Sequence, residues 1–137
     1  MKKIVLLLLA TVLMSATTKN AKPNFIGKWT GDDNKEVGYI TFDKEGYASF
    51  EMQGQVIGGK EFDINGKKGK MTYVINTKTN PIQVDFIITN LDTGEEKRML
   101  CIAEFIDKNT MNFALNFENI RPKDFLSKNA IVLTREK

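Results

Sequence analysis

IQVDFIITNLDTGEEKRMLCIAEFIDKNTMNFALNF, residues 82–117, carries the clearest structural signal in this chain. Three largely apolar segments lie within it, at 82–91, 97–106 and 110–117. The short stretches between them, 92–94 and 107–109, are built from Asp, Thr, Gly, Lys and Asn, several of which tolerate the positive φ angles of tight hairpins. The pattern therefore predicts three antiparallel β-strands joined by short turns.

The alternation of residue types indicates which side chains of these strands share a face. Along the last strand the apolar positions are Met111, Phe113, Leu115 and Phe117, and the positions between them are Asn112, Ala114 and Asn116. In 82–89 and 99–106, however, apolar residues occupy both parities. These two strands are expected to face a core on one side and a second apolar group, or a ligand cavity, on the other.

The same period of two continues outward from this stretch. Further strands are predicted at 25–31, 36–42, 47–52, 61–64, 70–77 and 130–135. Short antiparallel strands in this number need a barrel or a two-sheet sandwich to remove their exposed edges. Because most connections are short, and only 118–129 offers a long crossing, we predict an all-β fold: an antiparallel, eight- to nine-stranded up-and-down barrel. The glycine-rich stretch 54–59 is predicted to be a flexible or bulged strand connection at the barrel mouth, and a lid if a ligand enters.

The N-terminal segment has the organisation of a secretory signal peptide. Lys2 and Lys3 precede an uncharged apolar run at 4–14, which is too short to cross a ~30 Å hydrocarbon core. We predict a signal peptide over 1–18, with cleavage between 15 and 21, and a barrel domain over 19–137. The protein is then exported to the periplasm or the extracellular space, with no stable membrane span after cleavage. The alternative is a buried first helix.

The residue inventory excludes several kinds of chemistry. The chain of 137 residues has no histidine and one cysteine, which rules out Ser-His-Asp and Cys-His catalysis, His-ligated zinc and an internal disulfide. Removal of Lys2 and Lys3 lowers the net charge from +3 to about +1, which argues against a nucleic-acid partner. The basic stretch 67–70 is predicted to be a solvated hairpin tip, and Cys101 a buried, inert thiol. No metal site and no cofactor are predicted, since 32–34 lacks the spacing of a calcium loop.

Two groups of residues carry a family resemblance. Gly27-Lys28-Trp29 resembles the Gly-x-Trp signature of the lipocalins, in which the tryptophan closes one end of an eight-stranded barrel and an arginine of the last strand stacks on its indole; Arg135 occupies a matching place. The C-terminal half resembles a family of small, uncharacterised, secreted bacterial domains classed as lipocalin-like. That second resemblance rests on Asn80-Pro81, Asp85, the turns at 92–94 and 107–110, Arg121-Pro122 with Phe125, and the closing strand that ends at Arg135. The second resemblance implies a fold, and the resemblance to lipocalins implies structural roles for Gly27, Trp29 and Arg135.

Asp85 interrupts an apolar strand, where an ionised carboxylate is costly unless it is paired. Arg121 is a suitable partner because its planar guanidinium holds a carboxylate through two hydrogen bonds. We predict that the two side chains meet and tie the Arg121-Pro122 segment to the barrel wall. Two alternatives are that Asp85 points to solvent, or that the pair lines a cavity and holds a polar group of a ligand.

The function expected from these observations is non-catalytic binding of a small, mostly apolar ligand inside the barrel. The predicted lining residues are Phe42, Phe50, Tyr73, Phe86, Phe105, Phe113 and Phe117. The first alternative is a protein-interaction module of the cell envelope, with a filled core and a binding surface on its outside or open end. The second is a hydrolase that uses the carboxylates of Asp85 and Glu104.

Overall fold

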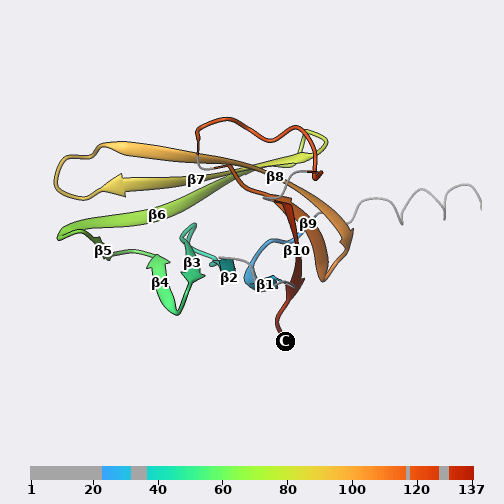
Figure 1. The fold of residues 1–137 in the computed structure, drawn as a ribbon, viewed down its shortest axis with the longest axis horizontal. Helices are drawn as coiled ribbons and strands as arrows, with labels where there is room; N and C mark the ends of the chain where they lie inside the picture. Colours follow the sequence, from blue (N-terminus) through green and yellow to red (C-terminus); the bar gives the residue numbers. More distant parts are fainter. Residues whose placement is uncertain (1–22, 32–36, 117, 127–129) are drawn as a thin grey trace, which may run out of the picture.

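The computed structural model describes residues 23–31, 37–116, 118–126 and 130–137, which form ten β-strands (Figure 1). The strands are β1 (Gly27–Gly31), β2 (Val37–Phe42), β3 (Ala48–Met52), β4 (Gln55–Gly58), β5 (Phe62–Ile64), β6 (Lys67–Asn76), β7 (Ile82–Asn90), β8 (Glu96–Asp107), β9 (Thr110–Ala114) and β10 (Ala130–Arg135). Within the described residues there is no helix, and so no helical segment of the length and apolarity that crossing a membrane requires. The predicted signal peptide over 1–18 lies outside the described residues.

All ten strands belong to one antiparallel sheet. Its order is β4-β3-β2-β1-β10-β9-β8-β7-β6-β5, so strands that follow one another along the chain are paired, except β4 and β5, and β1 also pairs with β10. The two edge strands, β4 and β5, are themselves consecutive in sequence. Hydrogen bonds cross the seam near them: Met71 N donates to Gly59 O (2.9 Å), and Tyr73 N donates to Gly46 O (3.1 Å). The sheet is therefore a nearly closed barrel, which confirms the predicted all-β, antiparallel, up-and-down arrangement.

The predicted count of eight or nine strands was too low, because β4 was not among the predicted strands. Residues 55–58, which we expected to belong to a flexible connection and a lid, form a hairpin with β3, in which Phe50 is opposite Ile57. The glycine at the end of this strand permits a close approach: Gly58 has φ of +125°, and a Cβ built there would lie 2.4 Å from Ala48 O. Glycine at this position serves strand pairing and not mobility.

The barrel interior is filled by the inward-facing side chains of the long strands. Trp29, Ile40, Phe42, Phe86, Met111, Phe113 and Leu133 are all almost fully buried. Their alternation with exposed or half-buried neighbours follows the period of two that the sequence shows. Burial of this many large apolar groups, at roughly 25 cal/mol per Å², is the main stabilising contribution to the fold.

The outer face of β7, β8 and β9 is covered as well. Ile87, Ile102 and Ala114 have the opposite parity to the interior residues, yet they are also buried. The connection between β9 and β10 runs along the outside of β7 and β8 over the described residues 115, 116 and 118–126, drawn in orange to red in Figure 1. The prediction that two strands are apolar on both faces is thus confirmed, and the chain itself supplies the second apolar contact.

Candidate functional site

One end of the barrel is closed by the indole of Trp29. Its Nε1 donates to Phe25 O (2.9 Å), and the guanidinium carbon of Arg135 lies 4.3 Å from the centre of the ring. Phe105 contacts both Phe25 and Trp29 edge-to-face, with ring centroids 5.0 and 5.9 Å apart. An arginine over an indole contributes about 0.5 to 2 kcal/mol, depending on how far the pair is removed from water.

The guanidinium of Arg135 uses all three of its nitrogens in hydrogen bonds. Its acceptors are the backbone oxygens of Asn24, Ile26 and Lys108 and the side-chain oxygen of Asn109. Gly27 makes room for this group, since a Cβ at Gly27 would lie 3.1 Å from Arg135 Nη1. The structure therefore brings together Gly27, Trp29 and Arg135, three of the five residues predicted to have structural roles, where the first and last strands pair.

The predicted ligand-lining phenylalanines pack against one another in the middle of the barrel. The ring of Phe86 has its centroid 5.6 Å from that of Phe42, 4.7 Å from that of Phe50 and 6.2 Å from that of Phe113. All four side chains are at most 2% exposed. Their mutual contacts occupy the centre of the barrel, and we call these four residues the aromatic core.

The other three predicted lining residues lie elsewhere. Tyr73 contacts Phe42 edge-to-face, and its hydroxyl donates to Asp43 O (2.7 Å). Burial, with a smaller contribution from the Asp43 carboxylate, raises the pKa of Tyr73 above its usual value. Phe105 belongs to the closed end described above, and Phe117 lies outside the described residues.

Asp85 and Arg121 meet, as predicted, but on the outside of the barrel. Arg121 Nη2 lies 2.8 Å from Asp85 Oδ1, and Arg121 Nη1 donates to Cys101 O (2.9 Å). The contact with Oδ1 is an ion pair without hydrogen-bond alignment, so this buried oxygen gains a neighbouring positive charge and no hydrogen bond. The pair joins the 115–126 crossing to the wall formed by β7 and β8.

A second arginine, which the sequence analysis missed, also contacts Asp85. Arg98 Nη1 lies 3.2 Å from Asp85 Oδ2, although the Arg98 side chain is half exposed. Arg98 is opposite Ile87 on the neighbouring strand, diagonal to Asp85. The register of the 82–91 and 97–106 hairpin was the signal that would have identified it.

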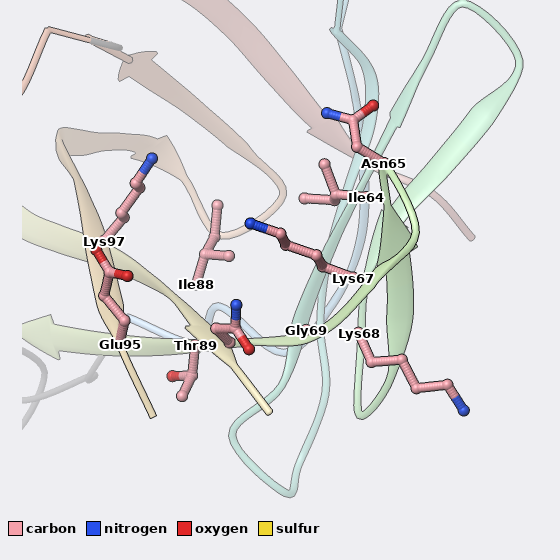
Figure 2. Close-up of a pocket in the computed structure, with 10 residues that line it drawn as sticks. Ile64, Asn65, Lys67, Lys68, Gly69, Ile88, Thr89, Glu95 and Lys97 are labelled. Carbon is pink, nitrogen blue, oxygen red and sulfur yellow. The ribbon is translucent and has the colours of Figure 1, made fainter. Parts of the chain in front are cut away.

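A cleft of about 280 Å³ opens at the other end of the barrel, between the β5–β6 and β7–β8 hairpins (Figure 2). Its lining residues are Ile64, Asn65, Lys67, Lys68, Gly69, Ile88, Thr89, Asn90, Glu95 and Lys97. Figure 2 shows Ile64 and Ile88 on two sides of the cleft, with the Lys67 side chain reaching between them. We call this site the open-end cleft.

Strand register explains why the open-end cleft continues the barrel interior. Ile88 is opposite Met71 on one side and Lys97 on the other, and Met71 belongs to the buried core. Residues directly opposite one another in an antiparallel pair share a face, so Ile88 and Lys97 face inward. Gly69 is opposite Phe62 in β5, and Lys67, two positions before Gly69, is opposite Ile64. Lys67 therefore has the same parity as the buried Met71 and also faces inward.

The charges around the open-end cleft are unbalanced. Lys68 is paired with Glu61 (3.4 Å) and points away from the cleft in Figure 2. Within the part of the chain that the structure describes, neither Lys67 nor Lys97 forms an ion pair, and Glu95 is the one carboxylate in the lining. The predicted solvated hairpin tip at 67–70 therefore includes a lysine, Lys67, that faces a cleft.

A wider cavity of about 590 Å³ lies at the closed end. It is lined by Pro23, Asn24, Phe105, Asp107, Lys108, Asn109 and Arg135. Several of its polar groups are already used, because Asn24 O, Lys108 O and Asn109 Oδ1 all accept hydrogen bonds from Arg135. Phe105 supplies its one large apolar side chain, whereas the open-end cleft has two, Ile64 and Ile88.

The groups considered for catalysis do not converge on either cavity. Asp85 is held between two arginines on the outer face, and Glu104 is exposed and lines neither cavity. Cys101 is a free thiol in the core, and its burial strongly raises its pKa, which keeps it protonated. Among the described residues, no three His, Cys, Asp or Glu side chains are grouped as a metal site would require.

Comparison with known proteins identified no relative: no protein-family model, no curated protein and no solved structure matches the chain.

Proposed function

We propose that this protein is an exported, non-catalytic, lipocalin-like barrel that binds one small, mostly apolar ligand in the open-end cleft. The observation that carries the proposal is the cleft itself, whose isoleucines continue the apolar interior to the surface. Its volume of about 280 Å³ is close to the lower limit for small-molecule sites, ~300 Å³. Because the aromatic core occupies the centre of the barrel, the ligand binds between this core and the open end, and not among the four phenylalanines.

Export and the lipocalin-like character are supported by separate observations. The Lys2-Lys3 start and the apolar run at 4–14 support a signal peptide. The stacking of Arg135 on Trp29, where the first and last strands pair, supports the resemblance to lipocalins.

A protein-interaction module of the cell envelope is the second candidate. The packed aromatic core favours it, as do two apolar side chains on the outer crossing, Ile120 and Leu126, which are 61% and 90% exposed. Affinity capture from an envelope extract, with Leu126→Ser as the comparison variant, tests this candidate. A partner that is lost with Leu126→Ser supports it.

The apolar-ligand proposal is tested by titrating the purified protein with 1-octanol while its amide NMR spectrum is recorded. We expect saturable shifts that are confined to the signals of Ile64, Gly69, Ile88 and their neighbours. Ile64→Ser is expected to weaken binding about fivefold, because the ligand loses apolar contact area. The matched control is Val74→Ser. Val74 is a half-exposed apolar residue of β6, and it does not line the cleft. Shifts that do not saturate, or that are scattered over the barrel, contradict the proposal.

A further inference from the structure

We infer that the ligand of the open-end cleft is an anionic amphiphile: a short alkyl chain that contacts Ile64 and Ile88, with a carboxylate or phosphate head group bound by Lys67 and Lys97. This inference rests on the proposed function and specifies the chemical class of the ligand.

The first support is the position of each lysine relative to an isoleucine. Lys97 is directly opposite Ile88, and Lys67 is directly opposite Ile64. A lysine in such a position packs its methylene groups along the apolar surface and holds its ammonium group toward water. Figure 2 shows the Lys67 side chain reaching between the two isoleucines, so its ammonium group borders the space in which the alkyl chain and head group of an amphiphile would bind.

The second support is charge. Lys67 and Lys97 together exceed the single carboxylate of Glu95, while the third lysine of the lining is neutralised by Glu61. A bound anion removes this excess and accepts charge-assisted hydrogen bonds, which are about twice as strong as those between neutral groups. A cationic ligand meets two like charges, and a neutral one gains nothing from either ammonium group.

The third support is size. A volume of about 280 Å³ corresponds to roughly nine groups the size of a water molecule, at ~30 Å³ each. That space suits a single short alkyl chain with its head group at the rim. It does not accommodate the two long chains of a phospholipid.

The test compares ligands that share one alkyl chain and differ in head group: octanoate, octyl phosphate, 1-octanol and octylammonium. In NMR titrations at low ionic strength, we expect both anions to bind about tenfold more tightly than 1-octanol, and octylammonium to bind more weakly than 1-octanol. The preference for anions should decrease as salt is added. Inorganic phosphate tests the anionic head group without an alkyl chain, and it is expected to bind at least tenfold more weakly than octyl phosphate.

Variants then connect the preference to the two lysines. The double variant Lys67→Met with Lys97→Met keeps the side-chain length and removes both charges, so octanoate should bind about tenfold more weakly while the affinity for 1-octanol is unchanged. Lys70→Met is the matched control on the same strand, because Lys70 does not line the cleft, and it should leave both affinities unchanged.

Each remaining outcome contradicts a specific claim. Equal affinities for octanoate and 1-octanol, or an anion preference that survives in the double variant, overturn the anionic ligand and leave the apolar cleft standing. Inorganic phosphate that binds as tightly as octyl phosphate overturns the amphiphile and indicates a simple anion site. If none of the alkyl ligands binds, the proposed function fails and this inference fails with it.

Discussion

Asp85 lies in an apolar strand, where two arginines hold its carboxylate on the outer face of the sheet. A carboxylate in such a strand needs a partner, and the planar guanidinium of Arg121 made this residue the predicted one. The sequence does not show on which side of the sheet the pair lies. Both parities of the strand are apolar, so the interior and the outer face were equally suitable, and only the path of the 115–126 crossing places the pair outside.

Arg121→Ala should lower the free energy of unfolding by about 2 kcal/mol, because it leaves a mostly buried carboxylate with one half-exposed partner. Urea denaturation measures the change. Arg98→Ala is the control, and its cost should be about 0.5 kcal/mol, since Arg98 is exposed on one side. Equal losses from the two variants would show that the crossing is not held by this ion pair.

The buried thiol of Cys101 should make the free energy of unfolding depend on pH. Burial raises the pKa of its thiol above the ordinary value of 9.0, so the folded state retains a proton that the unfolded state releases at alkaline pH. Stability from this group is fully present below pH 9 and decreases as the pH rises above it, by up to about 1.4 kcal/mol per pH unit. Urea denaturation between pH 8 and about 10 measures this slope. Cys101→Ala should reduce the slope, and an unchanged slope contradicts the assignment to this thiol.

At the scale of elements, strand patterns were predicted well where side chains alternate and poorly where glycines interrupt them. The two-sided apolar pattern of β7 and β8 correctly indicated a second cover. In contrast, the sequence predicts a flexible or bulged connection in place of β4, because Gly54, Gly58 and Gly59 lie in or beside a segment of only four residues. Glycine weakens a strand signal, yet here it permits the close approach of two backbones.

Gly58→Ala should destabilise the protein by about 2 to 3 kcal/mol, because the added Cβ would lie 2.4 Å from Ala48 O at a φ of +125°. Gly54→Ala is the control: its φ is also positive, but nothing lies within 4 Å of the added Cβ, so about 1 kcal/mol is expected. Thermal unfolding of both variants measures the difference. Similar losses would mean that the turn conformation matters and the β3–β4 contact does not.

At the scale of the whole molecule, closure of the sheet was predictable and the location of the open-end cleft was not. Closure follows from the need to remove strand edges and from short connections. The cleft depends on how far two hairpins, β5–β6 and β7–β8, extend beyond the aromatic core, and that depends on register between strands. Composition does not encode register, which is why Lys67 was assigned to a solvated tip.

The seam between β4 and β5 also makes this barrel suitable for circular permutation. Lys60 and Glu61 are exposed and join two strands that are not paired with each other, while Glu136 N donates to Lys28 O beside the pairing of β1 with β10. A rearranged chain that begins at Glu61, ends at Lys60 and links residue 137 to residue 23 through a short flexible peptide would keep every strand pair. We expect it to refold cooperatively, as followed by Trp29 fluorescence, whereas a break inside the β7–β8 hairpin separates strands that are paired over eight residue positions.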